Sequence, residues 1–79
     1  MKELLEFIIG NILGKTAKFE VTEEDNDSVV TLTVKTEEKD GGLIIGKQGK
    51  VIKAIRNILR IKATLEKKKI ILLVNPNSN

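Results

Sequence analysis

The stretch that most constrains the fold is LIIGKQGKVIKAI, residues 43–55, where two glycines three positions apart interrupt an apolar pattern. Glycine adopts positive φ at little steric cost and lets a second backbone approach closely. The spacing of Gly46 and Gly49 therefore predicts a tight corner at which one helix ends and another begins. The N–H groups at the start of the second helix would then face the same solvent region as the ammonium groups of Lys47 and Lys50.

A nucleotide-binding loop is the first interpretation to test. Gly41, Gly46 and Lys47 satisfy the spacing G-x-x-x-x-G-K, but Gln48 stands where a Ser or Thr hydroxyl must hold magnesium. The intervening residues include three large apolar side chains, and the only acid downstream of the loop is Glu66. We therefore exclude an NTPase and expect the corner to hold a sugar–phosphate backbone, with the bases along a neighbouring apolar groove.

The charges are distributed unevenly along the chain. Residues 1–40 carry five lysines against ten acids, whereas residues 41–79 carry nine Lys or Arg against Glu66 alone. The second half would therefore attract a polyanion. The chain lacks histidine, cysteine, tryptophan and tyrosine, so we expect no catalytic residue, no metal, no cofactor and little aromatic stacking on bases.

The periodicity predicts one small α+β domain over residues 1–75, followed by a polar tail over 76–79. In chain order the sequence predicts a helix over 2–13, a strand over 17–24, a polar turn over 23–28, a strand over 28–36, a loop over 37–42, a short apolar turn up to the corner, a helix over 50–65 and a strand over 69–75. We expect Asn75 and the tail to fray. No apolar run is long enough to span a membrane.

The order of these elements predicts their topology. The short polar turn between the first two strands predicts an antiparallel hairpin. The third strand returns after a helical crossover, so it should lie parallel to the second strand, with the helices on one face of the sheet. We expect this third strand to be flanked by other strands in the sheet. The expected architecture is a three-stranded mixed sheet covered on one face by three helices.

Ile45, Gly46, Gly49 and Ile52 follow the pattern Ile-Gly-x-x-Gly-x-x-Ile within a strand–helix–corner–helix–strand order. In both respects the chain resembles the KH domain, in which such a corner joins two helices and clamps about four nucleotides of single-stranded RNA. The helix and strand that precede this core match the type II, prokaryotic arrangement. In length and order the chain is also similar to the small single-domain bacterial KH proteins of the KhpA family.

This resemblance implies a cytoplasmic RNA-binding protein, a post-transcriptional regulator or RNA chaperone, that dimerises and pairs with a second KH protein of the Jag type. Two alternatives remain open. The fold could serve mainly as a protein-interaction module with RNA contact secondary, and the ligand could be single-stranded DNA. The RNA-binding residues that the resemblance implies are Ile45, Gly46, Lys47, Gln48, Gly49, Lys50, Lys53 and Arg56.

The predicted helix over 50–65 carries a second feature. Its apolar arc, centred on Ile55, is widened along one edge by a stripe at spacings of four, three and four residues. One interpretation is a helix-to-helix seam between two copies of the chain, and the other is a wide core with one half-exposed isoleucine. The stripe consists of Ala54, Ile58, Ile61 and Leu65.

Overall fold

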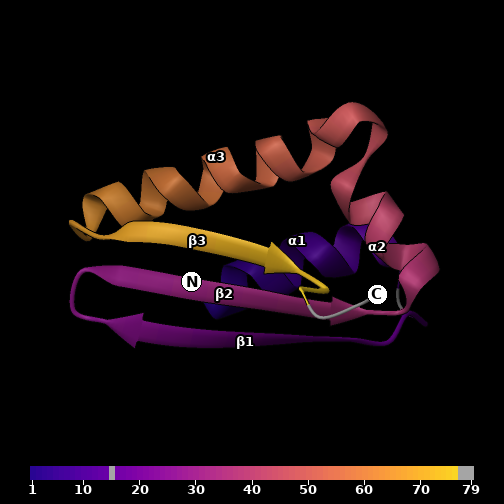
Figure 1. Ribbon diagram of the computed structural model, residues 1–79, viewed down its shortest axis with the longest axis horizontal. Helices are drawn as coiled ribbons and strands as arrows, with labels where there is room; N and C mark the ends of the chain where they lie inside the picture. The colour runs from indigo at the N-terminus through magenta and orange to yellow at the C-terminus, as the bar shows by residue number, and fades with distance from the viewer. Residues whose placement is uncertain (15, 77–79) are drawn as a thin grey trace.

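The computed structural model describes residues 1–14 and 16–76 and, within them, has the order helix–strand–strand–helix–helix–strand. The helices cover one face of a mixed sheet of strand order β1-β2-β3 (Figure 1). This is the predicted α+β architecture, which is therefore confirmed. The elements are α1 (Lys2–Leu13), β1 (Phe19–Asn26), β2 (Val29–Thr36), α2 (Glu38–Ile45), a 3₁₀ turn η1 (Lys47–Gly49), α3 (Lys50–Leu65) and β3 (Lys69–Val74).

The strand pairing is the predicted one. β1 and β2 form an antiparallel hairpin in which Val21 lies opposite Val34, and β2 pairs with β3 in parallel, with Leu32 opposite Leu72. All four side chains point toward the helices and are buried. Because side-chain direction alternates along a strand, the intervening residues of β3 point to the uncovered face. β3 pairs only with β2 and is an edge strand, so the prediction that the third strand is flanked in the sheet was wrong.

The core lies between the sheet and the helices. Each helix contributes large apolar side chains that are completely buried, at the helical spacing that the sequence shows. Burying one such side chain contributes about 1.5–3 kcal/mol. The inner faces of β1 and β2 complete the layer. The fully buried large side chains are Leu5 and Ile9 of α1, Leu32 and Val34 of β2, Ile44 of α2 and Leu59 of α3.

Two segments predicted as polar loops are regular structure, so these predictions were wrong. β1 continues to Asn26, which narrows the turn to Asp27 and Ser28. α2 begins at Glu38, inside the predicted loop over 37–42 and several residues before the apolar stretch that leads to the corner. Acidic residues in the first turn of a helix interact favourably with its dipole, and Glu38 and Asp40 occupy that turn of α2.

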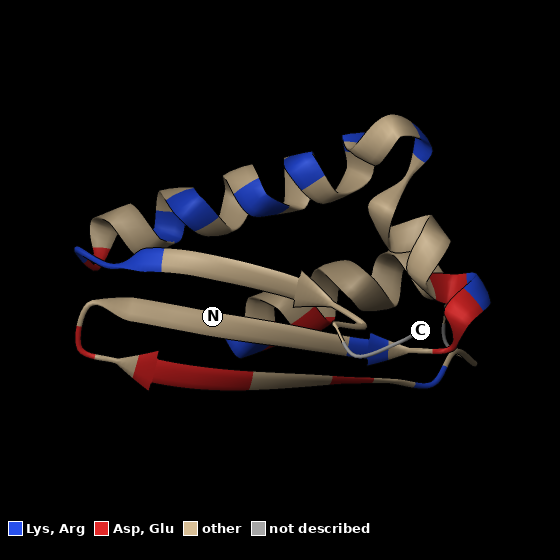
Figure 2. Cartoon of the chain, in the orientation of Figure 1, with Lys and Arg blue, Asp and Glu red and all other residues tan. Residues whose placement is uncertain are grey.

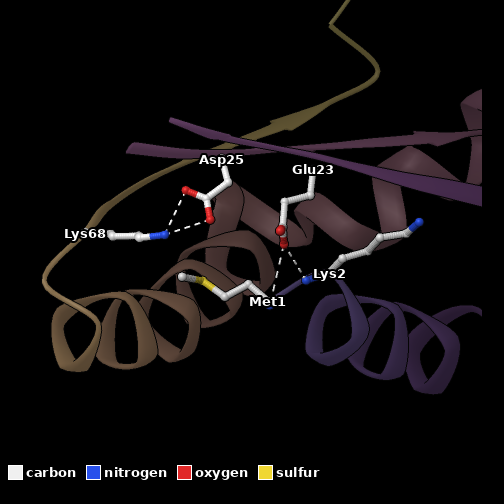
Figure 3. A network of polar contacts seen from close by, with 5 residues as sticks. All are labelled: Met1, Lys2, Glu23, Asp25 and Lys68. Atoms are coloured by element: carbon white, nitrogen blue, oxygen red, sulfur yellow. Dashed lines mark hydrogen bonds and ion pairs between the residues drawn. The ribbon is translucent and has the colours of Figure 1, made fainter. Parts of the chain in front are cut away.

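Two acids of β1, Glu23 and Asp25, bind groups near the ends of other elements (Figure 3). Glu23 Oε1 accepts a hydrogen bond from the Lys2 N–H at 2.9 Å, and the Met1 ammonium nitrogen lies 3.5 Å from the same oxygen. Lys68 Nζ donates to both carboxylate oxygens of Asp25, at 2.8 and 2.7 Å, and this hydrogen bonding raises the pKa of Lys68. Acids that were predicted to lie in a solvated turn therefore bind the start of α1 and the α3–β3 connection to β1.

The predicted fraying of Asn75 was also wrong. Its backbone N–H donates to Val34 O at 2.8 Å, and its side chain bonds to Thr36. Of the predicted tail over 76–79, Pro76 is described and residues 77–79 lie outside the described residues. Within residues 1–14 and 16–76, no helix is both long and apolar enough to cross a lipid bilayer.

Candidate nucleic-acid interface

The predicted corner lies between α2 and α3. α2 ends where the Gly46 N–H donates to Gly42 O at 2.9 Å, and the Gly49 N–H then donates to Gly46 O at 3.1 Å, which closes a tight turn. Gly46 has φ 76° and ψ 174°, and Gly49 has φ 77° and ψ 16°. L-residues with side chains rarely adopt such φ values. The chain therefore changes direction here through two glycines at positive φ.

Gly46 is required for a second reason, which is close packing. A Cβ atom built on Gly46 would lie 2.7 Å from Val51 Cβ and 2.9 Å from Val51 N. Both distances are shorter than any ordinary van der Waals contact, so the first turn of α3 packs directly against the Gly46 backbone. Gly49 differs, because a Cβ there would meet no described heavy atom within 4 Å.

Gln48 completes the corner in an unusual conformation. It has φ 57° and ψ 24°, in the left-handed region that costs a non-glycine residue about 1–3 kcal/mol. Its side chain is exposed. Backbone strain of this kind gathers at ligand-binding sites, and here the left-handed turn is what presents Lys47 and Gln48 together at the apex.

The corner is also the positive end of α3. Gly49 is the N-cap residue, and no side chain of the described residues forms a capping hydrogen bond there. Because the first N–H groups of a helix lack intrahelical partners, they add partial positive charge beside the exposed Lys47 and Lys50. Figure 2 shows Lys and Arg along α3 and at the start of β3, whereas Asp and Glu gather on β1, its hairpin and the first turn of α2.

The structure brings six of the eight predicted RNA-binding residues together at the corner, from Ile45 to Lys50. Lys53 and Arg56 follow one and two turns along α3 and are exposed. Beside the corner, Ile45 is 41% exposed. Leu43, which was not predicted, is 56% exposed, but it lies about 200° around α2 from Ile45 and so faces another side of the helix. Within the described residues, no cluster of His, Cys, Asp or Glu could hold a metal ion.

The predicted stripe lies on the solvent side of α3. Ile58 is 47% exposed, Ile61 66% and Leu65 80%, so the wide-core interpretation is wrong. A surface hollow of about 270 Å³ opens between two turns of this stripe and is lined by Arg60, Ile61, Thr64 and Leu65. Because α3 turns about 100° per residue, the stripe and Arg56 lie on opposite flanks of the helix.

The fold and the corner define the class. A sheet of two antiparallel strands and one parallel strand, covered by helices that meet at a Gly-x-x-Gly turn, is a KH domain of type II. The sequence profile described as "KhpA/KhpB, KH domain" matches residues 2–74. The chain belongs to this KhpA/KhpB KH-domain family.

Curated relatives agree with this assignment. The RNA-binding protein KhpA of Clostridium perfringens is 37% identical over 71 residues, which are 90% of this chain and 95% of the relative. The RNA-binding protein KhpA of Clostridium acetobutylicum is 34% identical over 71 residues, again 90% of this chain and 95% of the relative. That of Chlamydia trachomatis is 36% identical over 59 residues, 75% of this chain and 76% of the relative. No solved structure matches the chain significantly.

Proposed function

We propose that the chain binds single-stranded RNA at the Gly46–Gly49 corner. The observation that carries this proposal is the corner itself, where a left-handed turn, the uncapped start of α3 and two exposed lysines coincide. The relatives named as RNA-binding proteins support the choice of RNA as the ligand.

The chemistry of binding follows from this arrangement. A phosphate would be held at the apex by N–H groups and by the ammonium group of Lys47, and Lys50, Lys53 and Arg56 would follow the backbone of the strand. The bases would rest on the exposed apolar surface of Ile45. The chain has no tyrosine or tryptophan, so the stacking energy available to sites built on aromatic platforms is absent. Binding of a short oligonucleotide is therefore weak.

The double variant Lys47→Asp/Gln48→Asp tests the proposal, because it places two carboxylates where phosphate must sit. Affinity for a short single-stranded RNA should fall about tenfold or more, with an unchanged circular dichroism spectrum. Thr16→Asp/Lys18→Asp is the matched control, since it makes the same change in net charge at exposed positions just before β1. Fluorescence anisotropy measures both.

Equal loss in both double variants would show that only net charge matters, and no loss in either would overturn the proposal. If Lys47→Asp/Gln48→Asp abolishes RNA binding but not dimerisation, the alternative of a pure interaction module is excluded. A matched deoxyribonucleotide strand separates RNA from single-stranded DNA, because the two differ at the 2′-hydroxyl.

We also propose that two copies pair through the stripe on α3. Its spacing of four, three and four residues reads the same in both directions, so an antiparallel two-fold pairing sets Ile58 against Ile61 and Ala54 against Leu65. A self-complementary patch is what a two-fold interface requires.

This pairing leaves the corner and Arg56 open, because the corner lies beyond the start of the stripe and Arg56 lies on the opposite flank of α3. Each corner lies about ten residues from the midpoint of the stripe, so the two corners would stand roughly 30 Å apart along the helix axes. A strand long enough to reach both would bind more tightly than a tetranucleotide. Pairing with a KH protein of the Jag type through the same stripe, and a cytoplasmic location, rest on the family resemblance alone.

A further inference from the structure

Asn75 connects the end of β3 to the start of α2. Its side-chain Oδ1 accepts the Thr36 backbone N–H at 2.8 Å, and its Nδ2 donates to Thr36 Oγ1 at 3.0 Å. Thr36 Oγ1 in turn donates to Glu37 O at 2.8 Å, the carbonyl that also accepts the N–H of Gly41 at 3.1 Å. A continuous hydrogen-bond chain therefore runs from Asn75 into the first turn of α2.

The Asn75 side chain acts as one more rung of the β2–β3 ladder. The last backbone rung is the Asn75 N–H bound to Val34 O at 2.8 Å. Beyond it the backbone leaves the sheet, because Asn75 has φ 46° and Pro76 follows. The side-chain carbonyl then takes the place of the next backbone acceptor for the Thr36 N–H. Asparagine tolerates this left-handed φ better than most residues.

Gly41 makes room for this amide. A Cβ atom built on Gly41 would lie 2.8 Å from Asn75 Nδ2 and 3.6 Å from Thr36 Oγ1. Gly41 lies in the interior of α2 and has no positive φ, so its lack of a side chain serves packing and not backbone conformation. The Asn75 amide thus sits directly on the helix whose other end is Gly46.

We propose that Asn75 is a positioning residue for the RNA site: its amide, seated on Gly41 and bonded to Thr36, fixes α2 and through it the Gly46–Gly49 corner. The inference rests on the proposed function of that corner. Asn75 itself need not touch RNA. Its loss would let α2 shift relative to the sheet and α3, which would loosen the groups that converge on phosphate.

The test uses three variants and one control. Asn75→Gly removes the amide but keeps the left-handed φ accessible, and Gly41→Ala pushes a methyl group into the amide. The double variant Asn75→Gly/Gly41→Ala removes that collision. Asn26→Gly is the matched control, since it makes the same change at an exposed position at the far end of β1. RNA affinity and amide hydrogen exchange are measured for each full-length chain.

Asn75→Gly should weaken RNA binding about three- to tenfold, the worth of one ordinary hydrogen bond. Amide exchange should rise in α2 and at Gly46 and Gly49, while α1 and β1 stay protected. Gly41→Ala alone should weaken RNA binding to a similar extent. In the double variant with Asn75→Gly it should cause no further loss of RNA affinity. Asn26→Gly should leave binding unchanged.

Three outcomes would overturn the inference. One is unchanged RNA affinity in Asn75→Gly while Lys47→Asp/Gln48→Asp abolishes binding, which would leave the proposed function intact. Another is an exchange increase spread evenly over the whole domain, which would show a general loss of stability. The last is full additivity of Asn75→Gly and Gly41→Ala, which would show that the two residues act independently.

Discussion

Val51 occupies the space that a side chain at Gly46 would need: a Cβ atom on Gly46 would lie 2.7 Å from Val51 Cβ. The contact joins the last residue before the corner turn to the first turn of α3. It makes the two glycines of the corner unequal, although both have positive φ.

Gly46→Ala should therefore cost more than Gly49→Ala. The first variant combines backbone strain with a collision and should lower the free energy of unfolding by about 2 kcal/mol or more. The second adds strain alone, about 1 kcal/mol. Urea unfolding measures both variants, and equal costs would show that Val51 moves aside without penalty.

RNA binding should weaken as salt increases, because the proposed contacts are mostly to phosphates. For single strands the slope of log K against log salt is about −0.7 per phosphate neutralised. Two to four contacts at the corner and along α3 predict a slope of roughly −1.5 to −3. Affinity that does not change with salt would show that Lys47 and its neighbours do not meet phosphate.

Ile61→Asp should separate the proposed dimer and leave each copy folded, because Ile61 is 66% exposed and lies outside the core. Phe7→Asp is the matched control, since Phe7 of α1 is 70% exposed and outside the stripe. Analytical ultracentrifugation should find a monomer for the first variant and a dimer for the second. An unmutated chain that is monomeric at micromolar concentration would contradict the homodimer. The stripe would then serve a different partner, and mixing the chain with a Jag-type KH protein would test for a complex between the two.

Neighbouring acids of β1 should differ in their contribution to stability. Glu23 points to the helix side and accepts the Lys2 N–H at 2.9 Å, whereas Glu24 points to the uncovered face. Glu23→Ala should lower the free energy of unfolding by about 1 kcal/mol, the usual cost of losing a helix N-terminal acceptor. Glu24→Ala should stay within about 0.5 kcal/mol of the unmutated chain. Equal effects would indicate that the Glu23 contact does not persist in solution.

The ion pair of Lys68 and Asp25 should matter only where Lys68 is charged. Because Asp25 raises the pKa of Lys68 above its ordinary value of 10.5, the pair stabilises the fold below that pH. The contribution is lost as pH rises through the folded-state pKa. The difference in unfolding free energy between the unmutated chain and Asp25→Asn should therefore shrink at alkaline pH. A constant difference would show that Asp25 acts by other contacts.

Much of this fold follows from local pattern. The alternation of Val30, Leu32 and Val34 identifies the central strand, because side-chain direction in a strand has a period of two. The Gly46–Gly49 spacing identifies the corner, because two positive-φ positions are needed to join helices so closely. The stripe on α3 could be located from helical periodicity. Periodicity alone could not decide whether the stripe lies in the core or on the surface.

The tertiary structure decided what depends on residues far apart in the chain. Asn75 and Thr36 are 39 positions apart, and Glu23 and Lys2 are 21 apart. In the sequence, Asn75 resembles the start of a tail, and the acids resemble solvated turns. Their hydrogen-bond partners are brought near only when β3 pairs with β2 and α1 packs on the sheet. The sequence determined the order of the elements and the position of the corner, because these depend on local pattern. The packing of the sheet on its helices decided how far β1 and α2 extend and which polar groups anchor them.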